Sequence, residues 1–185
     1  MNNAPIGIFD SGIGGVTIFK SIKKLLPKEN FLYFSDNLNS PYGNKSKKEI
    51  QTLSLKNSEW LLNQGCKIIV VACNTATTNC ISLLRKSFKT PFIGVEPAIK
   101  PAATNTKTGN IGVLATKGTL NSNLFGITSN DYCSNINIIE KNGDGLVDMI
   151  ENGILNGTEI EKLLLKFLSP MIKSNIDHLV LGCTH

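Results

Sequence analysis

The sequence has little charge, few aromatic residues and no long apolar run. Charged residues make up 18% of its 185 residues, but the hydrophobic share of 41% is ordinary, so an intrinsically disordered chain is excluded. The lysines behind the net charge of +5 are scattered and aromatic residues are only 6%, so we expect no nucleic-acid partner. With no apolar run of roughly 18 residues and no secretion signal at the start, we expect no membrane partner and a cytoplasmic location.

The five cysteines are the first informative feature. Their odd number, in a chain expected in the cytoplasm, favours free thiols over a disulfide framework. No Cys-x-x-Cys pair occurs, and the spacing of Cys66, Cys73 and Cys80 matches no usual zinc pattern, so we expect no metal. Any special cysteine should then be catalytic, whereas Cys66, Cys80 and Cys133 are interpreted as small buried core residues.

Short runs rich in Ile, Val and Leu alternate with longer segments of helical period, which is typical of βαβ units and a parallel sheet. Strands are predicted at 5–9, 31–34, 66–72, 91–95, 110–115, 136–139 and 178–181, and helices at 16–26, 46–64, 75–88, 98–105, 145–151 and 158–172. Three prolines and Gly94 fall between Pro91 and Pro101, which indicates a junction. The sequence therefore predicts an α/β protein of two lobes, residues 1–95 and 96–185.

Two of the predicted helices begin with a capping-box pattern. Ser46 is followed three residues later by Glu49, and Thr158 is followed by Glu161. In such a box the hydroxyl and the carboxylate satisfy the first free amides of the helix. We therefore expect these two helix starts to be the best defined.

At two places in the chain, an apolar strand pattern ends in a small residue that is followed by a cysteine. These cysteines are Cys73 and Cys183. Residues just past the carboxyl ends of parallel strands line the ligand crevice of such a sheet. Cys73 also precedes a helical pattern, and a helix N-terminus favours a thiolate. Asn74, Thr75 and Thr184 add short polar groups that can hydrogen-bond a carboxylate. The matched pair points to a site with two functional thiols.

The end of the first strand carries an acidic residue followed by a glycine-rich turn. Asp10 and Ser11 begin this turn, whose backbone amides can hold an anion. It is not a dinucleotide fingerprint, because Thr17 occupies the place of the third glycine, and it is not a Walker loop, because no Gly-Lys-Ser/Thr follows. Asp36 follows the second strand, and the turn 40–43 presents amides and a phenol near the same crevice. Because a carboxylate repels phosphate, a small zwitterion fits better than a nucleotide.

Six segments of the chain together resemble glutamate racemases, and they follow the order of that family. They are Ile6–Gly15, Pro41–Gly43, Ala72–Ala76, Ile93–Ala98, Gly112–Thr116 and Leu181–His185. The resemblance implies two doubly wound α/β lobes with glutamate bound between them, and racemisation without a cofactor. It also implies a role in supplying D-glutamate for peptidoglycan. The family is often dimeric, although no sequence feature fixes the oligomeric state.

The resemblance also implies the residues of the site. Those linked with catalysis are Cys73, Cys183, Asp10, His185, Asp36 and Glu151. Those expected to contact the substrate are Asp10, Ser11, Pro41, Tyr42, Gly43, Asn74, Thr75, Thr184 and His185. In this scheme the two cysteines are the acid/base groups, the first assisted by Asp10 and the second by His185.

Two alternatives stay open at this point. Aspartate racemases share the plan of two cysteines but differ in the flanking residues, so an aspartate-type racemase is the nearest competitor. Members of the family usually continue past the Gly-Cys-Thr-His motif, which here ends at His185, so we expect the second lobe to be incomplete. A shortened, catalytically silent chain that acts as a binding module is therefore the other alternative, and thiol alkylation would distinguish it from a working site.

Overall fold

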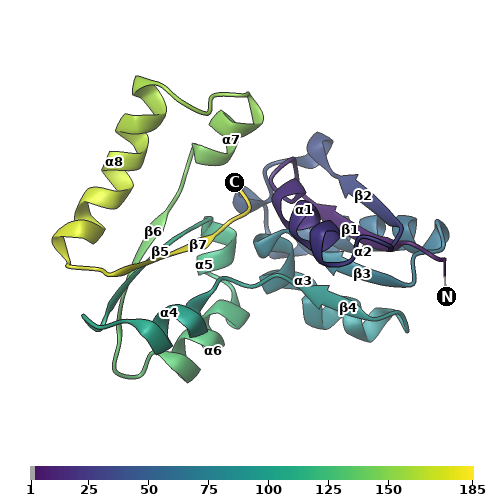
Figure 1. Ribbon diagram of the computed structural model, residues 1–185, viewed down its shortest axis with the longest axis horizontal. Coiled ribbons are helices and arrows are strands. Elements are labelled where there is room, and N and C mark those ends of the chain that lie inside the picture. Colours follow the sequence, from purple (N-terminus) through teal and green to yellow (C-terminus); the bar gives the residue numbers. More distant parts are fainter. Residues whose placement is uncertain (1–2) are drawn as a thin grey trace. The chain divides into compact units, whose positions relative to one another are not determined.

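The computed structural model describes residues 3–185, which form two compact units, each built around its own parallel sheet (Figure 1). The first unit comprises the described residues up to Glu96 together with Thr184, and the second comprises Pro97–Cys183 and His185. Across this range, none of the helices combines the length and the apolar content that a membrane crossing requires. The α/β class with two parallel-sheet lobes, predicted from the sequence, is confirmed.

The first unit has a four-stranded sheet in the order β2-β1-β3-β4, with every neighbouring pair parallel. Its elements are β1 (Ile6–Asp10), α1 (Val16–Leu25), β2 (Phe31–Ser35), η1 (Asn37–Asn39), η2 (Tyr42–Asn44), α2 (Lys47–Asn63), β3 (Ile68–Val71), α3 (Asn74–Ser87) and β4 (Phe92–Gly94). From β1 the chain crosses to β2 on one side of the sheet, and from β3 it crosses to β4 on the other side. The gap between the carboxyl ends of β1 and β3 is therefore the switch point at which such sheets bind ligands.

Alternate side chains of β1 pack against helices on opposite faces of this sheet. Ile6 and Ile8 form a buried cluster with apolar residues of α1. Gly7 points the other way, where an added Cβ would lie 3.0 Å from the Cys66 sulfur and 3.3 Å from a methyl of Leu61 in α2. Because both faces are covered, the strands read as continuous apolar runs rather than as alternating ones.

The second unit has a three-stranded parallel sheet in the order β6-β5-β7. Its elements are α4 (Ile99–Asn105), β5 (Asn110–Ala115), α5 (Lys117–Leu120), α6 (Asn123–Tyr132), β6 (Asn137–Asn142), α7 (Leu146–Glu151), α8 (Thr158–Lys173) and β7 (His178–Gly182). In Figure 1, α4 and α6 cover one face of this sheet and α8 covers the other. Two buried clusters match this layering: Val113 of β5 packs with α4 and α6, and Leu114 packs with Phe167 of α8.

Helices α5 and α6 were not predicted from the sequence. They are short, and within α6 only Phe125 is buried, so the segment has little amphipathic pattern to detect. Their starts are capped locally: Thr116 accepts a hydrogen bond from the Thr119 amide, and Ser122 accepts one from the Phe125 amide. Caps rather than apolar periodicity therefore mark this segment.

In two places the predicted boundaries differ from the structure for a clear physical reason. The capping box at Ser46 and Glu49 forms as expected, but Gly157, with φ of 100°, takes the N-cap position of α8 and Thr158 lies inside the helix. Strand β6 begins at Asn137 rather than at 136 and runs on through polar residues to Asn142. In both places backbone geometry overrides side-chain pattern: a glycine with a positive φ precedes the helix, and pairing with β5 extends the strand.

Candidate active site

In the first unit, Cys73 lies at the carboxyl end of β3 and is the N-cap residue of α3. Its thiol is 4% exposed. The Ala76 amide donates to the Cys73 sulfur over 3.4 Å, and the sulfur lies 3.6 Å from the Ser11 hydroxyl. The positive end of the α3 dipole and the Ala76 amide thus face the sulfur, a setting that favours a thiolate.

Asp10, at the end of β1, is fully buried and is surrounded by the glycine-rich turn that follows it. The amides of Gly12 and Gly15 both donate to Asp10 Oδ2 over 3.1 Å. A Cβ at Gly15 would lie 2.5 Å from the Asp10 Cβ, so only glycine permits this approach. The turn does bind an anion, as its composition suggested, but the anion held by these two amides is the carboxylate of Asp10 itself.

Asp36 and Tyr42 form a buried polar cluster with Asn57, a residue of α2. The Tyr42 hydroxyl donates to Asp36 Oδ2 over 2.5 Å, and Asn57 Nδ2 contacts both groups. Burial, the hydrogen bond to Asp36 and the negative charges of Asp36 and Cys73 raise the pKa of Tyr42, so the phenol stays protonated. Pro41 is half-buried and Gly43 is buried in the same turn. Sequence reasoning missed Asn57, because a single asparagine within a helical pattern gives no signal.

The polar residues after Cys73 are also buried, and the side chains of Asn74 and Thr77 bind backbone groups. Asn74 Nδ2 donates to the Val95 carbonyl over 3.1 Å. Thr77 accepts from the Val95 amide and donates to the Val71 carbonyl, which ties the ends of β3 and β4 together. Thr75 is 3% exposed and accepts the side chain of Asn79 at its carbonyl. The first turn of α3 is therefore a rigid frame around the Cys73 sulfur.

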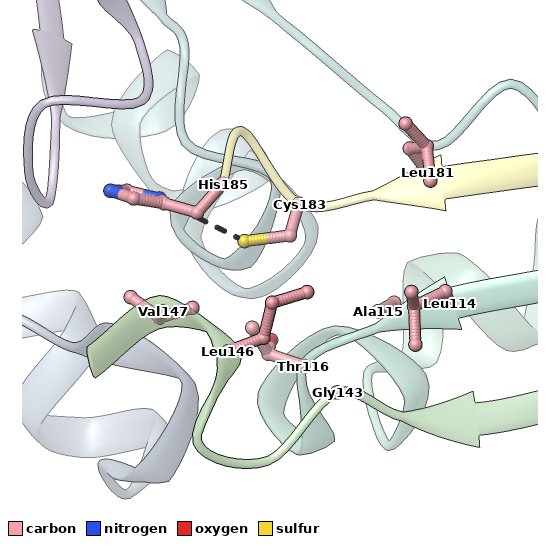
Figure 2. A pocket seen from close by; sticks show the side chains of 9 residues that line it. All are labelled: Leu114, Ala115, Thr116, Gly143, Leu146, Val147, Leu181, Cys183 and His185. Carbon is pink, nitrogen blue, oxygen red and sulfur yellow. Dashed lines mark hydrogen bonds between the residues drawn. The ribbon is translucent and has the colours of Figure 1, made fainter. Parts of the chain in front are cut away.

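In the second unit, Cys183 follows β7 and is partly exposed. The Cys183 sulfur lies 4.0 Å from Nδ1 of His185, the pair joined by the dashed line in Figure 2. His185 Nε2 lies 2.5 Å from Oε1 of Glu151, which ends α7, and the imidazole is only 1% exposed. Thiol, imidazole and carboxylate thus form a line of three groups within this unit. Thr184 is grouped with the first unit by its contacts.

A cavity of about 50 Å³ lies beside Cys183 and His185 (Figure 2). Its other walls are mostly apolar and come from Leu114, Leu146 and Val147. Sequence reasoning missed these residues. For Leu114 the available signal was its place near the end of the predicted strand 110–115, where parallel sheets line their crevices. Leu146 and Val147 lie at the start of a predicted helix and gave no such signal.

The three remaining cysteines differ from this pair. Burial raises the pKa of the Cys66, Cys80 and Cys133 thiols, that of Cys80 to about 11. A thiol whose pKa is raised is mostly protonated at neutral pH and is a poor nucleophile or base. Their surroundings agree with their interpretation as core residues.

Comparison with known proteins identifies the class. The sequence profile of the Asp/Glu/Hydantoin racemase family matches residues 6–185, and the chain belongs to that family. It is 45% identical over 185 residues to the glutamate racemase of Cupriavidus pinatubonensis, covering all of this chain and 68% of the relative. Identity to the glutamate racemase of Ralstonia pickettii is 43% over 182 residues, covering 98% of this chain and 64% of that protein.

Solved structures point to the same family. The crystal structure of glutamate racemase from Francisella tularensis in complex with D-glutamate superimposes with a TM-score of 0.85 at 34% identity, covering all of this chain and 70% of that one. The chain thus spans about two thirds of the length of these relatives. The resemblance to racemases, drawn from six sequence segments, is confirmed by these comparisons.

Proposed function

We propose that the chain is a glutamate racemase that interconverts L- and D-glutamate by proton transfer at the α-carbon, with two thiols and no cofactor. The observation that carries the proposal is the pair of strand-end cysteines, each in a setting unlike that of the three buried thiols. The names of the relatives support glutamate as the substrate, and the Francisella tularensis structure is described as a complex with D-glutamate.

Inversion of a stereocentre by proton transfer needs one group to take the α-proton and a second to deliver a proton to the opposite face. We assign these tasks to Cys73 and Cys183. When one is the thiolate base the other is the thiol acid, and their roles exchange for the reverse direction. Asp10 would assist Cys73, and His185, held by Glu151, would assist Cys183.

The carbanion-like transition state must be stabilised without an external electron sink. In our proposal the carboxylate and the retained ammonium group of the substrate are bound by side-chain and backbone groups near the two thiols. These groups are Asp10, Ser11, Pro41, Tyr42, Gly43, Asn74, Thr75, Thr184 and His185. Asp36 would act through Tyr42, whose phenol it holds by a hydrogen bond.

The biological setting follows from the product. D-Glutamate is a building block of peptidoglycan, so we propose that the chain serves cell-wall synthesis. The cytoplasmic location expected from the sequence, and the homodimer expected from the resemblance, stay predictions.

The test is proton NMR of the purified chain with L-glutamate in D2O, followed by chiral analysis of the product. We expect loss of the α-proton signal together with the appearance of D-glutamate, and neither with L-aspartate. The Cys73→Ala variant is the matched control for inversion and should form almost no D-glutamate. Exchange with aspartate but not with glutamate would favour the aspartate-type racemase. A folded chain that exchanges neither amino acid would refute racemisation and favour a binding module.

A further inference from the structure

One amide side chain on α2 lies under the turn that contains Tyr42 and Gly43. Asn57 is 3% exposed. Its Nδ2 donates to Oδ2 of Asp36 over 3.2 Å and to the hydroxyl of Tyr42 over 3.0 Å. One NH2 group thus supplies a hydrogen to each partner. A buried amide used in this way fixes the distance between the two groups it binds.

The other side-chain donors to Asp36 belong to the turn that Asp36 itself begins. Asn39 Nδ2 donates to Oδ1 over 2.8 Å, and the Tyr42 hydroxyl donates to Oδ2 over 2.5 Å. In residues 3–185, no lysine, arginine or histidine forms an ion pair with this carboxylate. Asn57 is therefore the side-chain donor that ties the cluster to a long helix of the unit's framework rather than to the turn.

The same turn contacts the helix that Cys73 caps. The 3-10 helix η2 contacts α3, the helix whose N-cap is Cys73. Tyr42 and Cys73 are also near enough to each other for the charge of one group to affect the ionisation of the other. A change in the position of Tyr42 or Gly43 would therefore change the walls of the site beside the sulfur.

From these contacts we infer that Asn57 is a positioning residue: its two N–H groups, bound to Asp36 and Tyr42, hold the turn 40–43 where it binds the amino-acid substrate. It touches no substrate itself. The inference rests on the proposed racemase function and adds a residue of α2 to it. Because the substrate-binding turn is held in the same place before and during proton transfer, Asn57 should set binding rather than the rate of the chemical step.

The variant Asn57→Asp tests this most directly, because it keeps the shape and replaces the NH2 donor with an acceptor beside the Asp36 carboxylate. We expect KM for glutamate to rise about tenfold while kcat changes by less than about threefold. Asn57→Ser keeps one donor and should give a smaller rise in KM. Asn63→Asp, with the same change of charge at an exposed position of α2, is the matched control and should leave both constants unchanged.

Hydrogen exchange gives a second readout that needs no enzyme activity. In Asn57→Asp, the amides of residues 37–46 should exchange at least about tenfold faster than in the unsubstituted chain, while the amides of β1 and β3 stay protected. Asn63→Asp should show no such change. If the unsubstituted chain does not racemise glutamate, the proposed function fails, but local exchange at 37–46 still decides the role of Asn57.

Three results would overturn the inference. The first is an Asn57→Asp variant with the KM and the exchange pattern of Asn63→Asp. The second is a fall in kcat with KM unchanged, which would mean a part in proton transfer. The third is loss of protection throughout the first unit in both Asn57→Asp and Asn57→Ser, which would mean that Asn57 supports the fold as a whole.

Discussion

The two strand-end cysteines occupy the same place in their sheets but have different neighbours. Cys73 is buried, caps α3 and has a backbone amide and a serine hydroxyl beside its sulfur. Cys183 is partly exposed and faces His185, whose other ring nitrogen is paired with Glu151. A parallel sheet thus supplies the position of each thiol, while its neighbours are local groups: a helix N-terminus in one unit and an imidazole with a carboxylate in the other.

This difference has a consequence for the chemistry. In the proposed scheme Cys73 is assisted by Asp10 and the dipole of α3, and Cys183 by His185, so the two bases do not depend on the same side chains. Removal of one helper should therefore impair one thiol and spare the other.

Removal of either thiol should separate the two directions of the reaction. Cys73→Ala and Cys183→Ala should each lower racemisation by at least about 10²-fold to 10⁴-fold, the range for loss of a general acid or base. Each variant keeps one base, so each should still exchange the α-proton of one enantiomer in D2O without inversion. The two variants should act on opposite enantiomers, as measured by NMR with L- and with D-glutamate. Normal turnover in either variant would rule out the scheme with two bases.

The second prediction concerns the helper of Cys183. Glu151→Gln removes the charge that orients His185, and we expect alkylation of Cys183 and racemisation both to fall by about 10-fold to 10²-fold. Alkylation of Cys73 should be unchanged, as followed by mass spectrometry of each cysteine. Glu159→Gln, with the same substitution on the exposed first turn of α8, is the control. An equal fall at Cys73 would contradict the independence of the two thiols.

Most of the fold could be predicted from the sequence, because parallel strands that are buried on both faces have continuous apolar sequences. The runs at Ile6 and Ile68 lie in the predicted places, as does the cap at Ser46. The helices after Thr116 could not be predicted, since they bury few apolar residues and depend on caps. The start of α8 was missed because the conformation of Gly157, not the hydroxyl of Thr158, begins the helix.

The candidate site could be predicted from the sequence only in part. The positions of Cys73 and Cys183 follow from one local rule, that a polar residue after a buried strand lies at the crevice. Asn57 obeys no such rule, because it reaches Asp36 and Tyr42 from the middle of a helix, and that contact exists only once α2 packs on the sheet. Residues that act through another side chain are set by tertiary structure.

A smaller effect, on the free energy of unfolding, is expected at the starts of α2 and α8, which have similar sequences. Ser46 caps α2 and shares a capping box with Glu49, so Ser46→Ala should lower the free energy of unfolding by about 1 kcal/mol. Thr158 follows the residue that caps α8, so Thr158→Ala should change it by less than about 0.5 kcal/mol. Urea unfolding of both variants checks the difference. An equal loss would mean that the hydroxyl of Thr158 also caps its helix.

The smallest effect on stability is expected just before the strand that leads to a site cysteine. The residue at this place differs between the two units. In the first unit Lys67, before β3, forms an ion pair with Glu29. In the second unit Asp177, before β7, accepts hydrogen bonds from the Thr106 hydroxyl and the Lys107 amide, each over 2.6 Å. The Thr106 hydrogen bond, then those from His178 and the two backbone amides, lower the pKa of Asp177 below its ordinary value.

The sign of the resulting pH dependence is fixed by that direction. A carboxyl whose pKa is lowered in the folded state stabilises the fold above its ordinary pKa of about 3.9 and loses this contribution as the pH falls through the folded value. Asp177→Asn should therefore lower the urea midpoint slightly at about pH 7, and the difference from the unsubstituted chain should shrink towards about pH 3. Asp131→Asn, the same change on exposed α6, should show no such convergence. A deficit of Asp177→Asn that grows at low pH would mean that the protonated acid, not the carboxylate, holds the start of β7.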